Sequence, residues 1–325
     1  MRRQATIARI FATTLLVAGT VSPAMAADQS SGQKDKDMVL IPSVEFTMGN
    51  FEHGDEMKHQ VALDAYLIDR YETSNALYQE FMKATGHPAP AYWDNPKLNK
   101  PNQPVVGVSW IEASTFCKWK GKRLPTEAEW EWAAKGPEGG KPYPWGDAID
   151  LKKANYGGTV GRTMPVDSYS EGVSGFGVYN MAGNVFEWIS DWYEPDYYKD
   201  SPKLSPQGPE QGYNFFNQGQ VRVLRGGSWI APASSLRTSH RFWNRPENNS
   251  YGVGLGFRCA KSAPVISKDS RQTGRDAFIA SLIAMGEEKY GDAMAAIGKA
   301  LAADPDNREY LATRELIEKS TKKKK

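Results

Sequence analysis

Between residue 38 and about residue 260, apolar residues come in short runs that alternate with polar residues. Runs such as Met38–Ile41 and residues 61–68 are typical of strands. Gly, Trp, Tyr and Pro are spread between these runs, and long periodic segments are few. This pattern of short apolar runs separated by Gly, Trp, Tyr and Pro predicts a compact α+β domain over residues 38–262, with much irregular structure.

Two parts of this domain have helical spacing. The first, residues 74–84, is capped by Thr73 or Ser74 and stops at Gly86. The second begins with a helix over residues 109–120 and resumes after Leu124-Pro125. There Thr126 and Glu129 have the spacing of a capping box, in which each side chain bonds the other residue's backbone amide.

Residues 263–325 form a separate helical tail in this interpretation. Residues 275–288 and 292–303 have helical spacing, and a third helix is expected over residues 308–319. The apolar pattern of the second helix is similar to the second half of a tetratricopeptide repeat, although a plain helical hairpin explains it equally well. A single repeat leaves an apolar face open, so the tail should pack on the main domain, on a second copy or on a protein partner.

The first 26 residues have the features of a secretory signal peptide. Arg2, Arg3 and Arg9 precede and flank a short apolar run, and Ala24-Met25-Ala26 is a small-residue cleavage site. The run is too short to span a bilayer, which needs roughly 20 apolar residues. We therefore expect a periplasmic or secreted protein without a membrane span, exported by the general or the twin-arginine route. Residues 27–37 are polar and read as a disordered linker.

The charge balance argues against a nucleic-acid partner. The formal net charge is +2, and loss of the three signal-peptide arginines leaves −1 for the mature chain. A chain with a net charge so close to zero has no overall positive electrostatic potential that would attract nucleic acid. The basic C-terminus, residues 322–325, is interpreted as a solvated end.

The chain has two cysteines, Cys117 and Cys259. In an oxidising compartment, a pair so far apart in sequence indicates one disulfide, with free buried thiols as the alternative.

Several ordered blocks together resemble the formylglycine-generating, or sulfatase-modifying, family, whose fold is related to C-type lectins. They are MVLIP (38–42), FTMG (46–49), YLIDRYETSN (66–75), PVVGVSW (104–110), GKRLPTEAEWE (121–131), PWG (144–146), YNMAGNVFEW (179–188), RGGSW (225–229) and GFRCA (256–260). The resemblance implies this fold over about 220 residues. It also implies a disulfide between Cys117 and Cys259.

The copper chemistry of the family has no ligands in this chain. Active members bind copper through two cysteines that follow the RGGSW block, because thiolates select copper(I). Ala231 stands at the first of these positions and Leu236 at the second, and no cysteine lies between Cys117 and Cys259. We therefore do not expect copper or formylglycine generation.

Polar residues remain in the same region: Ser228, Arg237, His240, Arg241 and Arg245. They are the candidate catalytic residues. The arginines are expected either to line an electropositive cleft for a carboxylate, phosphate or carbonyl, or to pair with core carboxylates. A non-haem iron site needs about two histidines and a carboxylate, so a lone hydrogen-bonded His240 is favoured over an iron ligand.

The resemblance also implies structural calcium. The family's calcium stretch corresponds to Asn180, Gly183, Val185 and Glu187, which offer the mixed oxygen ligands that calcium prefers. A second calcium site would use Asn155 and Tyr156, but the loop that carries its carboxylate is shortened here.

Three functions follow as hypotheses. The first is an exported family member without the copper pair, acting in maturation or oxidation of a peptide, protein or secreted metabolite, with an oxidoreductase as one form of this hypothesis. The second is a lectin-like binding or scaffold protein whose helical tail recruits a partner. The third is sulfatase activation itself.

Overall fold

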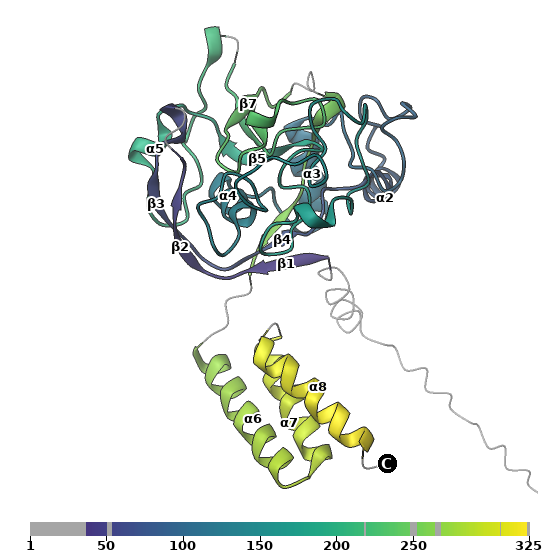
Figure 1. Ribbon diagram of the computed structural model, residues 1–325, viewed down its shortest axis with the longest axis vertical. Coiled ribbons are helices and arrows are strands. Elements are labelled where there is room, and N and C mark those ends of the chain that lie inside the picture. The colour runs from purple at the N-terminus through teal and green to yellow at the C-terminus, as the bar shows by residue number, and fades with distance from the viewer. Residues whose placement is uncertain are drawn as a thin grey trace, which may run out of the picture. The chain divides into compact units, whose positions relative to one another are not determined.

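The computed structural model describes residues 37–50, 54–217, 219–247, 252–263, 268–305 and 307–323 (Figure 1). The expected signal peptide, almost all of the expected linker and the last two lysines lie outside these ranges. Within the described ranges, no helix combines the length and the apolar character that a bilayer crossing requires.

A three-stranded antiparallel sheet joins the two ends of the main domain. Its order is β1 (Met38–Ile41), β4 (Tyr66–Asp69) and β9 (Ala260–Ser262). Val39 pairs with Ile68, and Ile68 pairs in turn with Ala260. The predicted run over residues 61–68 is therefore two strands, since exposed Asp64 interrupts it and the halves join different sheets.

The other strands form a hairpin and a four-stranded sheet. The hairpin pairs β2 (Val44–Met48) with β3 (His59–Leu63). The sheet has the order β7 (Phe242–Asn244), β6 (Arg222–Arg225), β5 (Phe186–Trp192) and β8 (Leu255–Gly256), with β5 and β8 parallel.

The described residues of the main domain also form the α-helices α2 (Asn75–Thr85), α3 (Trp110–Trp119), α4 (Glu127–Lys135) and the short α5 (Tyr197–Asp200). Ser74 caps α2, and Gly86 ends it in the left-handed conformation. The predicted capping box of Thr126 and Glu129 begins α4. Five 3-10 turns occur among the described residues: η1 (Gly54–Glu56), η2 (Ser170–Gly172), η3 (Phe215–Asn217), η4 (Ala233–Leu236) and η5 (Gly252–Gly254).

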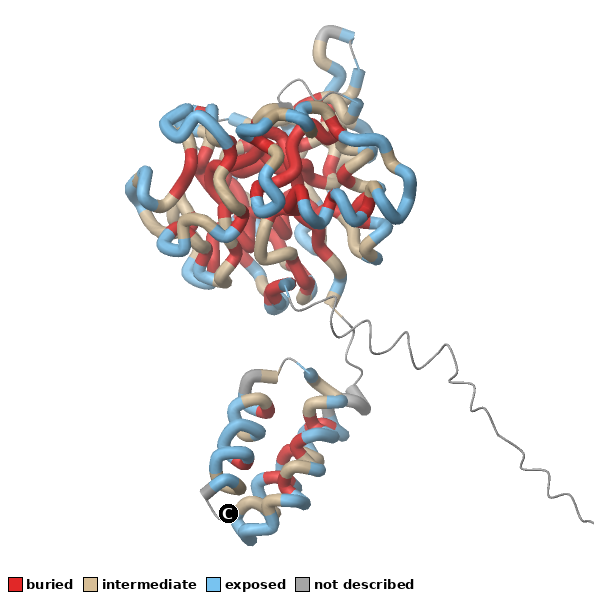
Figure 2. The backbone as a smooth tube through the Cα atoms, turned by 90° about the vertical axis from the view of Figure 1, so that its right-hand side faces the viewer, coloured by how far each residue is buried: buried red, intermediate tan, exposed pale blue. Residues whose placement is uncertain are grey.

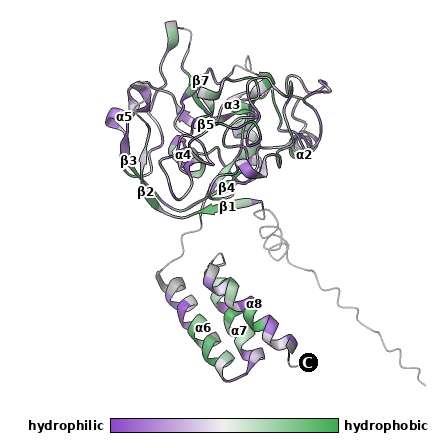
Figure 3. Cartoon of the chain, in the orientation of Figure 1, coloured by the Kyte–Doolittle hydropathy of each residue, from purple (hydrophilic) through white to green (hydrophobic). Residues whose placement is uncertain are grey.

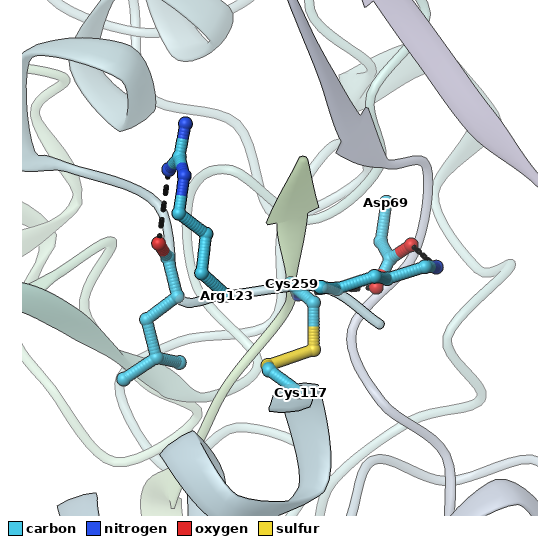
Figure 4. The surroundings of a disulfide bond; sticks show 6 residues. Asp69, Cys117, Arg123 and Cys259 are labelled. Atoms are coloured by element: carbon cyan, nitrogen blue, oxygen red, sulfur yellow. Dashed lines mark hydrogen bonds and ion pairs between the residues drawn. A yellow bond between two sulfur atoms is a disulfide. The ribbon is translucent and has the colours of Figure 1, made fainter. Parts of the chain in front are cut away.

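The core of the main domain is rich in aromatic side chains, and Trp130 and Trp188 are fully buried. Figure 2 shows buried segments running through this domain beneath exposed loops. The predicted disulfide is present and links Cys117 on α3 to Cys259 just before β9 (Figure 4). Asp69 accepts a hydrogen bond from the backbone amide of Cys259 and forms an ion pair with Lys122. The α+β prediction is confirmed.

In the described part of the tail the helices are α6 (Lys268–Gly286), α7 (Tyr290–Ala303) and α8 (Arg308–Lys323). They share an apolar cluster of Phe278, Ala293, Ile297, Ala300, Tyr310 and Ile317. Figure 3 shows apolar stretches on these helices. Some lie outside the cluster, because Ile279, Leu282 and Ile283 of α6 are exposed. The tetratricopeptide assignment stays a prediction.

Candidate functional site

The two positions that would hold copper in the family carry buried apolar side chains. Ala231 is 6% exposed and Leu236, at the end of η4, is 0% exposed. Both belong to the cluster that contains Cys117, Cys259 and Phe257. Since the chain's two cysteines are joined to each other, no free thiol is present.

Arg237 forms a buried ion pair with Glu56 of η1. Its Nη1 and Nη2 atoms donate to the two carboxylate oxygens, each at 2.8 Å, and Nη1 also donates to Ser239 Oγ at 3.1 Å. His240 lies beside them, with Nδ1 3.7 Å from Glu56 Oε1. Burial by itself raises the pKa of Glu56, but His240, Arg237 and Ser239 outweigh burial and lower this pKa to about 2. Glu56 is therefore ionised in the folded protein at neutral pH.

Arg241 is also paired inside the protein. Its Nε and Nη2 atoms donate to the Glu127 carboxylate at 2.9 and 3.1 Å, and its guanidinium lies over the rings of Tyr193 and Tyr198. Arg245 differs, because its side chain is 40% exposed and lies 4.0 Å from Glu247. Ser228 is buried. The five candidates therefore do not share one open cleft: two arginines neutralise carboxylates, and the third is at the surface.

Helix α4 supplies carboxylates that the sequence interpretation did not single out. The capping box at Thr126 fixes the start of α4, so Glu127, Glu131 and Lys135 recur every four residues along one face. Glu131 pairs with Lys135 at 2.7 Å and with Arg225 of β6. All three residues are buried. A four-residue repeat of charge in a helix rich in Trp and Ala is a signal that points to such a network.

The first set of expected calcium ligands lies in a buried polar cluster. Glu187 accepts hydrogen bonds from Arg258 Nε and Nη2, each at 2.7 Å, and from Trp130 Nε1 at 2.9 Å. Asn180 donates through Nδ2 to Glu72 Oε2 at 2.8 Å. Burial and repulsion from Glu187 raise the pKa of Glu72 to about 8. The Arg258 guanidinium bonds Glu187 and acts on Glu72 through its charge, so a further cation beside Glu72 would favour the ionised form of that carboxyl group.

The second set is connected to the first through Asn184. Asn155 Nδ2 donates to Asn184 Oδ1 at 3.2 Å and to the carbonyl of Arg162 at 2.9 Å. Asn155 Oδ1 is buried and accepts no hydrogen bond from the described residues. It is an oxygen that a cation would satisfy, although the Tyr156 carbonyl already accepts from Thr159. In the described part of the chain, no three His, Cys, Asp or Glu side chains come together as a metal site.

A cavity of about 770 Å³ opens next to Ser239. Its walls include Phe46 and Thr47 of β2, Trp132 and Lys135 of α4, Thr238 and Ser239. Through Ser239, the Glu56–Arg237 pair reaches the edge of this cavity. Neither the cavity nor Glu56 was identified from the sequence, because strand β2, helix α4 and residues 238–239 are far apart along the chain.

Two relatives and one solved structure match most of the main domain. A formylglycine-generating enzyme of Streptomyces coelicolor is 34% identical over 316 residues, covering 76% of this chain and 96% of its own length. A serine/threonine-protein kinase Pkn1 of Chlamydia pneumoniae is 37% identical over 249 residues; the match covers 70% of this chain but only 38% of that protein. The solved structure of PvdO from Pseudomonas aeruginosa superposes with a TM-score of 0.60 at 28% identity, covering 71% of this chain and 97% of that one.

Residues 23–263 match the model of the sulfatase-modifying factor enzyme 1-like domain. This match spans most of the chain, and it agrees with the fold and with the ordered blocks. The chain belongs to the sulfatase-modifying factor family.

Proposed function

We propose that this protein is an exported family member that acts without copper–thiol chemistry, by binding a peptide or protein client during that client's maturation. The observation that carries this proposal is the state of the cysteines: both are joined in one disulfide, and the two copper positions hold buried Ala231 and Leu236. Neither side chain can hold copper(I) or exchange with a substrate thiol.

The test is co-expression with a sulfatase that contains an unmodified cysteine in its modification motif. Mass spectrometry of the sulfatase should show no formylglycine, whereas a family member with both copper cysteines should convert it. Ala231→Cys with Leu236→Cys is the matched variant, and cuprous ion should bind to it and not to the parent chain. Formylglycine formed by the parent chain would overturn the proposal.

A structural calcium ion is part of the proposal. The Asn180–Glu187 segment lies beside Glu72, and the charge of the Arg258 guanidinium acts on both Glu72 and Glu187. Elemental analysis should find calcium in the purified protein, and a chelator should lower its melting temperature. Asn180→Ala should lose the ion, whereas Asn155→Ala tests the second set separately. Protein that contains no calcium and does not respond to chelator would contradict this part.

An oxidoreductase role is the second candidate. It is favoured by the position of His240, which is 20% exposed and 3.7 Å from the ionised carboxylate of Glu56. An ionised carboxylate in this position can orient the imidazole, and histidine is the side chain that most often transfers protons in catalysis. The same elemental analysis separates the candidates: stoichiometric iron or copper would favour redox chemistry, and calcium alone would favour client binding.

Export and partner recruitment complete the proposal. Residues 1–26 should direct a fused alkaline phosphatase to the periplasm, where that reporter becomes active, and Arg2 and Arg3 exchanged for lysine distinguish the twin-arginine route. The exposed apolar residues of α6, Ile279, Leu282 and Ile283, support partner binding by the tail. Exchange of these three for serine should abolish co-purification of that partner.

A further inference from the structure

The hairpin of β2 and β3 has one covered edge and one free edge. On β3, the amide of Ala62 donates to the carbonyl of Lys203 and its carbonyl accepts from the amide of Ser205, both at 2.7 Å. Residues 203–205 therefore cover the outer edge of β3. The backbone groups of Ala62 point away from β2, so its cross-strand neighbour Glu45 belongs to a pair without ladder hydrogen bonds.

It follows that Glu45 and Thr47 direct their backbone groups away from β3, since every second residue of a strand faces the same edge. Lys135 provides independent evidence, because its Nζ atom donates to the Thr47 carbonyl at 3.0 Å from that side. No described residue hydrogen-bonds the amide of Glu45, the carbonyl of Glu45 or the amide of Thr47. The free edge of β2 thus presents a donor, an acceptor and a second donor.

The cavity of about 770 Å³ lies next to this edge, since Glu45 and Thr47 are among the residues that line it. Glu45, Phe46 and Thr47 of β2 are among its lining residues, together with Lys58, Gln60, residues 138–142, Thr238 and Ser239. Its charged side chains already have partners: Lys135 pairs with Glu131, Lys141 with Glu138, and Glu45 with Lys203. Besides uncharged polar side chains such as Gln60 and Ser239, the cavity offers a ligand the strand backbone and the small exposed parts of the Phe46 and Trp132 rings, which pack at 4.9 Å.

We propose that the free edge of β2 binds an extended peptide segment of the client, which adds as a strand and lies in this cavity. Backbone donors and acceptors that recur every second residue match an extended polypeptide, and this is how strand addition obtains its affinity. A small or apolar peptide side chain would rest against Phe46 and Trp132. The inference rests on the proposed function only in taking a peptide as the client.

Thr47→Pro tests the edge directly. Proline removes the outward amide of Thr47 but keeps the ladder bonds of Phe46 and Met48 to β3, and proline is tolerated where a strand amide faces outward. Thr47→Val is the matched control, since it keeps the amide and loses only the hydroxyl that accepts from Gln60. The probe is the synthetic form of a dodecapeptide selected on the full chain from a random display library.

The peptide should bind at least tenfold more weakly to Thr47→Pro and within about twofold of wild type to Thr47→Val. Bound peptide should slow hydrogen exchange at the amides of Glu45 and Thr47. If Thr47→Pro fails to fold, alternate N-methylation of the peptide against the wild-type chain replaces it, and one of the two alternations should abolish binding.

Failure to select any peptide, or equal binding to wild type and Thr47→Pro, would overturn the strand-addition proposal. N-methylated peptides that bind unchanged would do the same. These outcomes are separate from the sulfatase assay. If the chain forms formylglycine but its β2 edge binds peptide, the proposed function alone is wrong. If the edge does not bind peptide, the conclusion drawn from the cysteines is unaffected.

Discussion

At the scale of single residues, the region after β6 is dominated by arginines that neutralise carboxylates. Arg237 and Arg241 reach Glu56 and Glu127 from distant parts of the chain and are almost completely buried. A buried guanidinium is costly unless a carboxylate faces it, and removing one partner leaves the other charge unpaired. These arginines therefore stabilise the fold of the main domain.

Arg241→Met measures this structural role, with Arg245→Met as its control. We expect the buried substitution to lower the free energy of unfolding by about 3–5 kcal/mol, because Glu127 loses its closest cation. The exposed substitution should cost less than about 0.5 kcal/mol. Urea unfolding followed by tryptophan fluorescence is suitable, since all ten tryptophans lie in the main domain. Equal effects of the two substitutions would show that Arg241 is not a structural partner.

Asp191 provides a pH-dependent prediction. Burial, and next the nearby Glu127 carboxylate, raise the pKa of Asp191 from 3.8 to about 7. Between these values the folded protein binds more protons than the unfolded chain, so the free energy of unfolding falls as pH rises. Asp191→Asn imitates the protonated acid and does not lose stability in this way. The difference in free energy of unfolding between the variant and wild type should therefore rise, in favour of the variant, by a few kcal/mol from pH 4 to pH 7.

Urea midpoints measured across this pH range give the difference. The informative quantity is how this stability difference between variant and wild type changes with pH. The added amide group can shift the stability by a constant amount at every pH, and such a shift does not affect the slope. Asp196→Asn, at an exposed residue that pairs with Lys199, should show no such slope. A constant difference for Asp191→Asn would mean that Asp191 is ionised in the folded protein throughout.

At the scale of elements, local chemistry fixes the helices and distant contacts fix the sheets. The caps at Ser74 and Thr126 involve neighbours three residues away, and they were predicted from the sequence. The parallel pairing of β5 with β8, and the split of residues 61–68 between two sheets, depend on residues far along the chain. The same limit hid Glu56, whose partner Arg237 lies 181 positions away.

The tail depends on one small apolar cluster, which makes it sensitive to cavities. Ile297→Ala should cost about 2–5 kcal/mol, because Ile297 is fully buried among α6, α7 and α8. Three helices that share so small an apolar core are expected to have a low free energy of unfolding. Hydrogen exchange of peptides from the tail should therefore become fast, whereas Ile283→Ala, at a residue that is 58% exposed, should leave exchange unchanged. Slow exchange in both variants would argue against this core.

At the scale of the whole molecule, the disulfide reinforces the closure of the main domain. Cys259 immediately precedes β9, which pairs with β4, and β4 pairs with the first strand of the domain. The amides of Arg123 and Ala260 also donate to each other's carbonyls at 2.9 and 2.7 Å. The bridge thus ties α3 to the site where the two ends of the domain meet (Figure 4).

Replacing both Cys117 and Cys259 with alanine should destabilise the main domain strongly. The bridge joins residues 142 positions apart, and the chain-entropy model assigns about 5 kcal/mol to a loop of that length. Urea unfolding followed by tryptophan fluorescence should show this loss. Reduced wild-type protein should unfold at nearly the same urea concentration as the double variant. Reductant should not affect the double variant. If reduction left the wild-type midpoint unchanged, strand pairing and the Asp69–Lys122 ion pair would suffice to close the domain.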